Sequence, residues 1–357
     1  MILLRFILFP FVPLYGWIIS IRNYFFNKGI FKSHKVDAKI ISIGNIVIGG
    51  SGKTPTTIYL VDLIKNAGIK VGVLSRDYGR KSKGFQLVSD GKEIFCDVET
   101  CGDELILTVT ECHVPAAACE NRVEGAKRLS IQTGVETIIL DDAFQHRWIK
   151  RDLDIIIFDQ YFLSKPGGID QNLIPTGLMR EPFTSVKRAD AIIINRKFSD
   201  YFPIPSVLLP YFEGKKIFNG YYKTTGIIDV KDHKFYNTEE FRNQKSLVVS
   251  GIARPASFLN ILSQYNINTE NKLIFKDHKH YTEKEVQLIR KKFYATNSHS
   301  VITTSKDAVK LSQFDLQLDD IDIYYLKIEL EIDKKEEFKN FIIEKLNSPY
   351  QLNLFER

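Results

Sequence analysis

The chain has 357 residues, of which 44% are hydrophobic, and a formal net charge of +6. This length and apolar content are enough for a large buried core and for two domains. Residues 1–39 hold six Lys or Arg and one Asp, so this segment carries +5 and residues 40–357 carry only +1. A basic N-terminus on a nearly neutral body argues against a nucleic-acid groove and fits an anionic membrane surface.

Residues 6–21 are the first notable segment, sixteen residues without a charge. As a helix they would be about 24 Å long, shorter than the roughly 30 Å hydrocarbon core of a bilayer, and Pro10, Pro13 and Gly16 would kink or break that helix. We therefore predict that a membrane-associated N-terminal helix, within residues 1–35, dips into one leaflet. A helix of the protein core is the alternative, and a signal peptide is disfavoured because no small-residue cleavage site follows.

A glycine-rich loop follows the first predicted strand, residues 40–43. Lys53 then begins a predicted helix that continues to about Ala67. A strand, a glycine-rich loop and a helix N-terminus together bind polyphosphates, with the lysine on the β- and γ-phosphates and the next hydroxyl on Mg²⁺. The predicted nucleotide contacts are Gly49, Gly50, Ser51, Gly52, Lys53 and Thr54. Val47 stands where the usual pattern has its first glycine, and a glycine-rich turn that caps a helix is the alternative.

Two later apolar strands end in acidic residues. Residues 137–140 are followed by Asp141 and Asp142, and residues 154–159 form another apolar run with an acid at its end. A carboxylate at a strand end beside a phosphate-binding loop can hold Mg²⁺ or its water ligands. We favour Asp141 and Asp142 as the metal ligands because a polar cluster follows them directly, and the second strand stays open as the alternative.

Two further motifs contain candidate polar residues. Residues 70–75 predict a strand that is followed by Arg76, Tyr78 and Arg80. Side chains at the strand ends of an open α/β sheet can bind an anionic substrate, and a solvated turn is the alternative. Asp103 lies just before an apolar run, where capping of a helix N-terminus would also explain it.

Strands and helices alternate along the chain. This pattern predicts an α/β fold with a doubly wound, P-loop NTPase-like sheet and a second, smaller α/β domain. Residues 196–237 are irregular and rich in Tyr, Phe and Lys, so we place the domain boundary there. The predicted organisation is a membrane-associated segment at 1–35, a P-loop domain at 36–215 and a smaller α/β domain with linking strands at 216–357.

The four cysteines lie within 24 residues of one another, at Cys96, Cys101, Cys112 and Cys119. Zinc sites often contain two cysteines separated by two residues, and no such pair occurs here, although His113 lies nearby. We predict free thiols in a reducing compartment, with a zinc site as the alternative.

Eight motifs within residues 40–311 resemble those of the tetraacyldisaccharide 4′-kinase family of lipid A biosynthesis, and they occur in the same order as in that family. They are GGSGKTP, VLSRDYGR, GDE, LDDAFQHR, LMREP, SGIARP, FKDHKHY and TTSKDAVKL. Ser51 and Ala143 stand where members of that family often carry threonine and glycine, and neither side chain is essential to the expected chemistry. The N-terminal apolar segment also resembles the membrane-binding element of the family.

This resemblance implies a kinase, an ATP-dependent phosphotransferase with an alcohol as acceptor, that uses ATP and Mg²⁺. The expected reaction moves the γ-phosphate of ATP to the 4′-hydroxyl of a tetraacyldisaccharide 1-phosphate and forms lipid IVA, a step in lipopolysaccharide synthesis. The expected partners are this lipid A precursor and an anionic membrane surface, with no nucleic acid and no obligate protein partner. The expected location is the cytoplasmic face of the inner membrane, as a peripheral or monotopic protein.

The resemblance also implies roles for individual residues. Asp103 is the expected general base for the sugar hydroxyl, His278 is its partner, and Lys53 is the third catalytic residue. The expected contacts with the disaccharide and its phosphate are Arg76, Tyr78, Arg80, Arg122 and Glu181. A membrane-tethered P-loop NTPase that acts as a switch or assembly factor is the alternative function, and it would hydrolyse ATP without phosphorylating a sugar.

Overall fold

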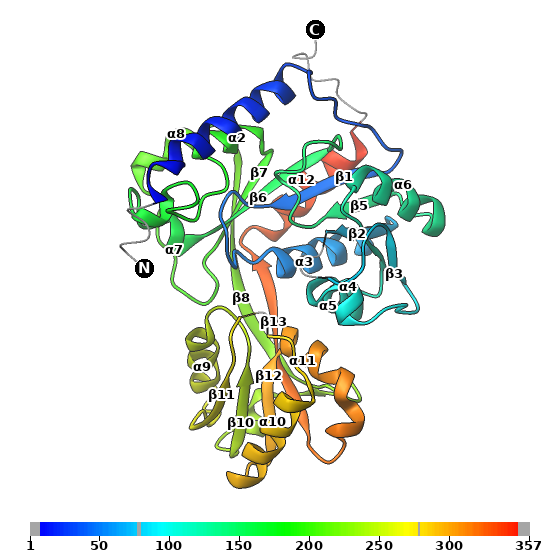
Figure 1. Cartoon of the computed structure of the whole chain (residues 1–357), viewed down its shortest axis with the longest axis vertical. Helices are drawn as coiled ribbons and strands as arrows, with labels where there is room; N and C mark the ends of the chain where they lie inside the picture. The colour runs from blue at the N-terminus through cyan, green and yellow to red at the C-terminus, as the bar shows by residue number, and fades with distance from the viewer. Residues whose placement is uncertain (1–7, 77–79, 278, 349–357) are drawn as a thin grey trace. The chain divides into compact units, whose positions relative to one another are not determined.

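The structure is a computed structural model that describes residues 8–76, 80–277 and 279–348. Helices alternate with mostly parallel strands, so the predicted α/β fold is confirmed (Figure 1). The chain divides into two compact units. Unit 1 contains Met1–Cys96, Thr108–Tyr222 and Leu330–Arg357, and unit 2 contains Asp97–Leu107 and Lys223–Glu329.

Unit 1 is built on a sheet with the strand order β8-β7-β6-β1-β5-β2-β4-β3. Its central strands are rich in isoleucine and almost wholly buried, as expected of parallel strands that helices cover on both faces. Strand β1 pairs in parallel with both β5 and β6, so Ile41 lies opposite Ile139 on one side and Leu153 on the other. The strands are β1 Lys39–Gly44, β2 Val71–Ser75, β3 Gln86–Asp90, β4 Pro115–Ala118, β5 Thr137–Leu140, β6 Leu153–Asp159, β7 Ala191–Asn195 and β8 Lys216–Asp229, which continues into unit 2.

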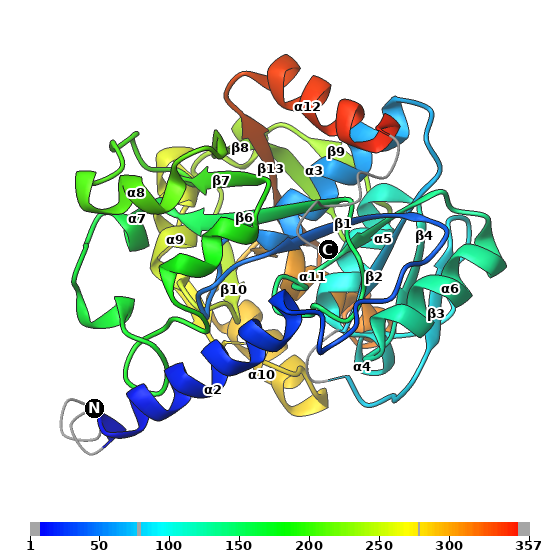
Figure 2. The same cartoon turned by 90° about the horizontal axis from the view of Figure 1, so that it is seen from above.

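Helices cover both faces of this sheet. Ala126 and Leu129 of α6 pack with Ile40, Leu74 and Ile138 in one hydrophobic cluster. Helices α2 and α12 lie on opposite sides of strands β1 and β6 (Figure 2). The helices of unit 1 are α2 Phe11–Asn27, α3 Lys53–Asn66, α6 Arg122–Thr133, α7 Gln160–Leu163, α8 Leu209–Phe212 and α12 Lys335–Asn347, with the 3-10 helices η1 Ile169–Gln171, η2 Phe183–Arg188 and η3 Ser206–Leu208.

The predicted N-terminal helix exists as α2, but it runs past the place where we expected it to break. Pro10 caps the helix and Pro13 lies in its first turn, where a missing N–H costs little because the first turn has no intrahelical acceptors for its N–H groups. Gly16 is accommodated without ending the helix. Within the described residues, no helix is long and apolar enough to cross a bilayer.

In unit 2, four strands pair in parallel in the order β11-β10-β12-β13. Val286 and Ile289 of α10 pack in one hydrophobic cluster with Leu247 and Val301 of the two central strands. The strands are β9 Phe235–Tyr236, β10 Ser246–Ser250, β11 Asn271–Ile274, β12 Ser300–Thr304 and β13 Ile323–Ile332, and β13 ends in unit 1. The helices are α4 Val98–Cys101, α9 Pro255–Gln264, α10 Glu283–Ala295, α11 Ser305–Leu311 and the first half of α5 Asp103–Cys112, with the 3-10 helices η4 Thr238–Phe241 and η5 Ser312–Gln317.

The cysteines correct one prediction. Cys96 and Cys101 are disulfide-bonded, so the expectation of free thiols is wrong for this pair. Cys112 and Cys119 are buried thiols, as expected. Burial raises the pKa of the Cys119 thiol, which keeps it protonated and unreactive near neutral pH.

Candidate active site

The glycine-rich loop joins the end of β1 to the N-terminus of α3 in unit 1. Gly49 and Gly52 have φ values of +119° and +100°, which L side chains rarely adopt. A Cβ at Gly52 would also collide with the side chains of Asn195 and Tyr222. The loop therefore requires glycine for its conformation and for its packing, and it delivers the chain to the positive end of the α3 dipole, where anions bind.

Polar side chains at the ends of β1 and β7 support this loop. Asn45, just after β1, donates from Nδ2 to Ser51 Oγ at 2.9 Å. Asn195, at the end of β7, donates from Nδ2 to the Ser51 carbonyl at 3.1 Å. Sequence reasoning did not identify Asn195, although a polar residue directly after a buried strand was the available signal.

Lys197 adds a further support to the loop and also contacts the acid at the end of β6. Its Nζ donates to the Gly50 carbonyl at 2.8 Å and forms an ion pair with Asp159 Oδ2 at 2.7 Å. Asp159 also accepts from the backbone N–H of Tyr161 at 2.9 Å. The carboxylate at the end of β6 therefore helps to hold the loop through Lys197, and the choice of the end of β5 as the metal-binding position stays a prediction.

The end of β5 places Asp141 and Asp142 beside the loop. Asp141 accepts from Thr57 Oγ1 of α3 at 3.3 Å, and Lys53 Nζ lies 3.8 Å from Asp142 Oδ1. Asp142 has a φ of 46°, an uncommon conformation for a residue other than glycine, and its side chain is one-third exposed. Because β5 pairs with β1, which leads into the glycine-rich loop, Asp142 and Lys53 lie close together.

Thr54, Asp141 and Asp142 offer one hydroxyl and two carboxylates, all hard oxygen donors. Mg²⁺ at nucleotide sites takes only one or two carboxylates, with waters and phosphate oxygens completing its shell. These residues therefore fit Mg²⁺ by donor chemistry. Among the described residues, no group of three or more His, Cys, Asp or Glu is arranged to hold a metal by itself.

Arg180 is a second cation at Asp142. Its Nη1 donates to both carboxylate oxygens, at 3.0 and 3.1 Å. Sequence reasoning named the next residue, Glu181, and missed Arg180. Asp142 therefore lies between two cations, Arg180 and Lys53.

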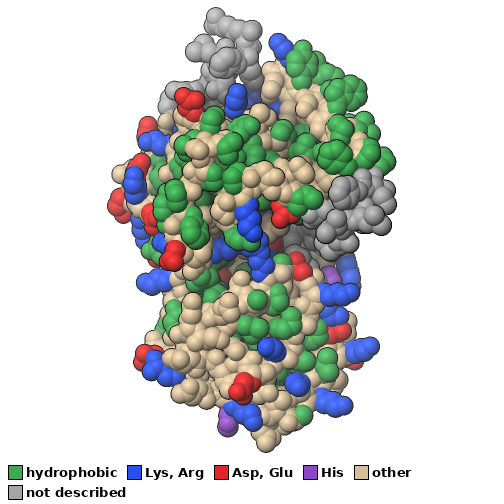
Figure 3. Space-filling view, turned by 90° about the vertical axis from the view of Figure 1, so that its left-hand side faces the viewer, with side chains coloured by type: hydrophobic (Ala, Val, Ile, Leu, Met, Phe, Trp, Pro, Cys, Tyr) green, Lys and Arg blue, Asp and Glu red, His purple; other side chains and the backbone are tan. Residues whose placement is uncertain are grey.

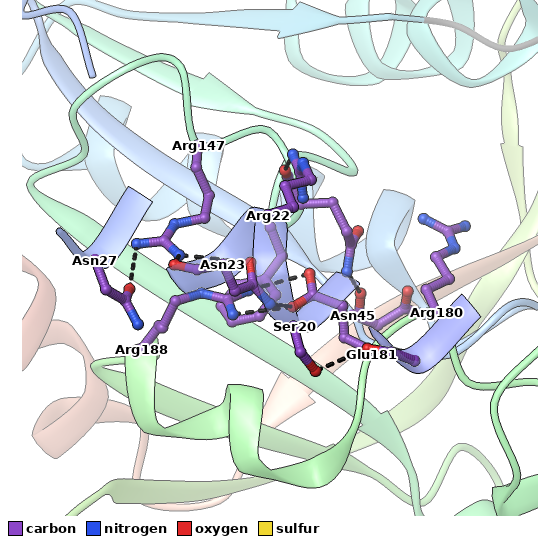
Figure 4. Close-up of polar contacts among 12 residues, drawn as sticks. Ser20, Arg22, Asn23, Asn27, Asn45, Arg147, Arg180, Glu181 and Arg188 are labelled. Atoms are coloured by element: carbon purple, nitrogen blue, oxygen red, sulfur yellow. Dashed lines mark hydrogen bonds and ion pairs between the residues drawn. The ribbon is translucent and has the colours of Figure 1, made fainter. Parts of the chain in front are cut away.

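Glu181 is fully buried and paired within the protein. Arg188 donates to its two carboxylate oxygens at 2.9 and 3.1 Å, and Asn23 of α2 donates to it at 2.9 Å (Figure 4). Burial would raise the pKa of Glu181, but the charge and hydrogen bonds of Arg188 outweigh that effect and lower the pKa. Glu181 is thus held as a buried anion that links α2 to the segment after Arg180.

Helix α2 makes further contacts with the same region. Tyr15 donates from its hydroxyl to the Arg180 carbonyl at 2.8 Å, and Arg22 donates to the Gln145 carbonyl at 2.5 Å. The Gln145 side chain in turn donates to the Asn45 carbonyl at 2.8 Å. Helix α2 is therefore joined by hydrogen bonds to segments of unit 1 that lie around the glycine-rich loop.

Arg122 and His146 lie near the acids. Arg122 is buried and donates to the carbonyls of Cys119 and Asp141, at 2.6 and 3.2 Å, and burial lowers its pKa to about 10. Burial and then the charge of Arg122 lower the pKa of His146 to about 4, so this ring is neutral at pH 7. Its Nε2 is buried without a hydrogen-bond partner within the described part of the chain. In the sequence, His146 is only one member of the polar cluster that follows Asp142.

The remaining predicted substrate contacts lie around the end of β2. Arg76 is exposed, whereas the Arg80 side chain is buried and donates to Ser82, to the Gly84 carbonyl and to Glu120. Arg80 therefore stabilises the loop that follows it through internal hydrogen bonds. Tyr78 lies outside the described residues.

Asp103 lies in unit 2, at the first position of α5. Its carboxylate oxygen Oδ2 is 2.7 Å from Lys310 Nζ, and both side chains are nearly buried. The next residue, Glu104, forms an ion pair with Lys306. His278, the predicted partner of Asp103, lies outside the described residues.

Residues 4–347 match the family model described as tetraacyldisaccharide-1-P 4′-kinase. The chain belongs to this family. A tetraacyldisaccharide 4′-kinase from Flavobacterium psychrophilum is 34% identical over 361 residues, which cover 97% of this chain and 98% of the relative. The tetraacyldisaccharide 4′-kinase of Chlorobaculum parvum is 34% identical over 316 residues, which cover 86% of this chain and 84% of the relative.

A comparison with solved structures gives the same family. A crystal structure of the "apo" form of LpxK from Aquifex aeolicus in complex with ATP is similar, with a TM-score of 0.80 and 29% identity. The match covers 96% of this chain and 99% of the Aquifex aeolicus chain. The family predicted from eight motifs is therefore confirmed, and with it the kinase class of enzyme.

Proposed function

We propose that this chain transfers the γ-phosphate of ATP to the 4′-hydroxyl of a tetraacyldisaccharide 1-phosphate, a lipid A precursor, and forms lipid IVA. The observation that carries the proposal is the family match over residues 4–347. The structure supports it with a phosphate-binding loop whose lysine lies 3.8 Å from an acid at the end of the adjacent strand. A kinase site needs this juxtaposition of a phosphate cradle, a cation and metal-binding oxygens.

In this proposal the loop from Gly49 to Thr54 binds the ATP phosphates through backbone N–H groups, and Lys53 neutralises charge on the terminal phosphates. Thr54, Asp141 and Asp142 would hold Mg²⁺, which when bound offsets negative charge on the phosphates. Arg180, which is paired with Asp142, would add a further positive charge beside the phosphates.

Asp103 is the proposed general base. Its carboxylate accepts the proton of the 4′-hydroxyl while the sugar oxygen forms a bond to the γ-phosphorus, and the bond from that phosphorus to the β–γ bridging oxygen breaks to release ADP. His278 is proposed to orient Asp103. Arg76 and Tyr78 remain proposed substrate contacts, whereas Arg80, Arg122 and Glu181 would act by holding the loops that line the substrate, because their partners are internal.

A transfer assay tests the function directly. The protein with ATP labelled at the γ-phosphate is expected to move the label to a tetraacyldisaccharide 1-phosphate acceptor in a Mg²⁺-dependent reaction. The matched control is an acceptor that already carries a 4′-phosphate, which should stay unlabelled. Release of labelled phosphate without labelling of the lipid would instead favour the NTPase switch.

We also propose that the protein works as a peripheral or monotopic protein at the cytoplasmic face of the inner membrane. Its acceptor is a lipid, and four large apolar side chains of α2 are more than half exposed: Phe11, Leu14, Trp17 and Ile18. Hydrophobic side chains cover much of the upper half of the face seen in Figure 3. An amphipathic helix with this composition and a basic flank binds anionic membrane surfaces.

Removal of these apolar side chains should release the protein from membranes. Deletion of residues 1–22 would also remove Tyr15 and Arg22, which contact the core, so substitution is the sharper test. Serine at the four exposed positions should weaken sedimentation with anionic vesicles by about 10-fold or more, since each buried apolar side chain contributes roughly 1.5–3 kcal/mol. Serine at Ile131 and Leu316, which are exposed but lie elsewhere, should change nothing. Unchanged sedimentation of the α2 variant would remove the proposed anchor.

A further inference from the structure

Two ion pairs join the start of α5 to α11 within unit 2. Lys310 Nζ lies 2.7 Å from Asp103 Oδ2, and Lys306 Nζ forms an ion pair with Glu104 Oε1. The lysines are four residues apart on one helix and therefore share a face. The carboxylates of two consecutive residues of α5 are thus paired with the ammonium groups of two lysines on successive turns of α11.

The two pairs differ in their exposure to water. The side chains of Lys310 and Asp103 are 8% and 12% exposed, whereas those of Lys306 and Glu104 are 29% and 27% exposed. Charges removed from water interact more strongly, and loss of one partner has larger consequences for the other. Loss of Lys310 should therefore affect Asp103 more than loss of Lys306 affects Glu104.

Helix α11 is itself fixed in place by Asp307, one turn before Lys310. Asp307 is fully buried and accepts hydrogen bonds from the Gly251 N–H at 2.9 Å, from the Tyr281 hydroxyl at 3.1 Å and from Thr304 Oγ1 at 2.8 Å. These donors come from three separate motifs of unit 2. Asp307 therefore fixes the start of the helix that carries Lys310.

We propose that Lys310 is a positioning residue for phosphoryl transfer, which holds the Asp103 carboxylate in one orientation and keeps it ionised so that it can accept the proton of the acceptor hydroxyl. The inference rests on the proposed role of Asp103 as general base. A cation in hydrogen-bond contact favours the charged form of a carboxylate, and burial without that cation disfavours it. Lys310 touches neither ATP nor the acceptor in this account and acts only through Asp103.

The test is the pH dependence of kcat in the full-length protein. Lys310→Met should move the acidic limb of the kcat profile to higher pH by about 1–3 units, because Asp103 then binds a proton more readily. The KM for ATP should stay within about twofold, and Lys310→Arg, which keeps the charge, should restore the parent limb. Lys306→Met, the matched control on the same helix, should leave the profile in place.

The outcomes separate this inference from the proposed function. If Asp103→Asn loses transfer and Lys310→Met keeps the parent profile, the positioning role is wrong and the base assignment stands. If Asp103→Asn retains full transfer, the base assignment itself fails. A thermal melt of each variant reports folding; if Lys310→Met does not fold, Lys310→Gln should show the same shift, and a loss of melting temperature with no shift would assign Lys310 a structural role only.

Discussion

Replacement of Lys53 with alanine is expected to lower kcat/KM for phosphoryl transfer by at least about 10²-fold, towards the background rate. Removal of one preorganised charge-stabilising donor typically has an effect of this size. Lys53 begins α3, where it can reach the β- and γ-phosphates of a nucleotide in the loop. The fold should survive the change, because Asp142 keeps its contact with Arg180. The measurement is steady-state transfer to the lipid acceptor, with a thermal melt in parallel.

The matched control for this variant is Lys65→Ala. Lys65 lies in the last turn of the same helix and donates to the Cys112 carbonyl at 2.8 Å. Its loss removes the same side chain far from the loop, so transfer should stay near the parent rate. Full transfer by Lys53→Ala would take the loop out of the mechanism.

Replacement of Asp103 should reduce kcat by about 10²–10⁴ with little effect on the KM for ATP. The general base acts in the chemical step, so its loss appears in kcat. Asp103→Asn is the better substitution, because Asp103→Ala would leave the nearly buried ammonium of Lys310 without its carboxylate and destabilise unit 2. Asparagine keeps an oxygen that Lys310 can bind.

Glu104→Gln is the control for Asp103. This residue follows Asp103 in the same helical turn and has its own lysine, so a general loss of charge at the start of α5 would affect both variants. We expect only the Asp103 variant to lose transfer. A change confined to the KM for ATP would instead give Asp103 the role of a helix-terminal residue.

Local sequence signals predicted much of the fold. The strand before the glycine-rich loop, the helix that begins at Lys53 and the strand at residues 137–140 are observed as β1, α3 and β5. Their signals lie within a few consecutive residues: β-branched runs mark buried strands, and glycines followed by lysine mark a phosphate loop. The eight motifs identified the family for the same reason. Each motif is a run of consecutive residues, so it can be recognised without knowing which residues lie near it in the folded protein.

Other features depend on contacts between distant residues. Strands β5 and β6 both flank β1 and both end in an acid, and the partners of these acids come from later parts of the chain: Lys197 pairs with Asp159, and Arg180 pairs with Asp142. Likewise, the residues next to Glu181 in the sequence do not show that Arg188 and Asn23 donate hydrogen bonds to its carboxylate.

The sequence by itself determined the family, the phosphate loop and the alternation of strands and helices, because those depend on adjacent residues. Tertiary structure alone decided that α2 holds the segment around Arg180, and that α12 returns to unit 1, where Phe338 packs on Tyr59 and Phe218. It also placed Lys310 on Asp103, about two hundred residues away in the chain. The reason is that burial and ion pairing are set by packing across the fold, which residue type and spacing do not specify.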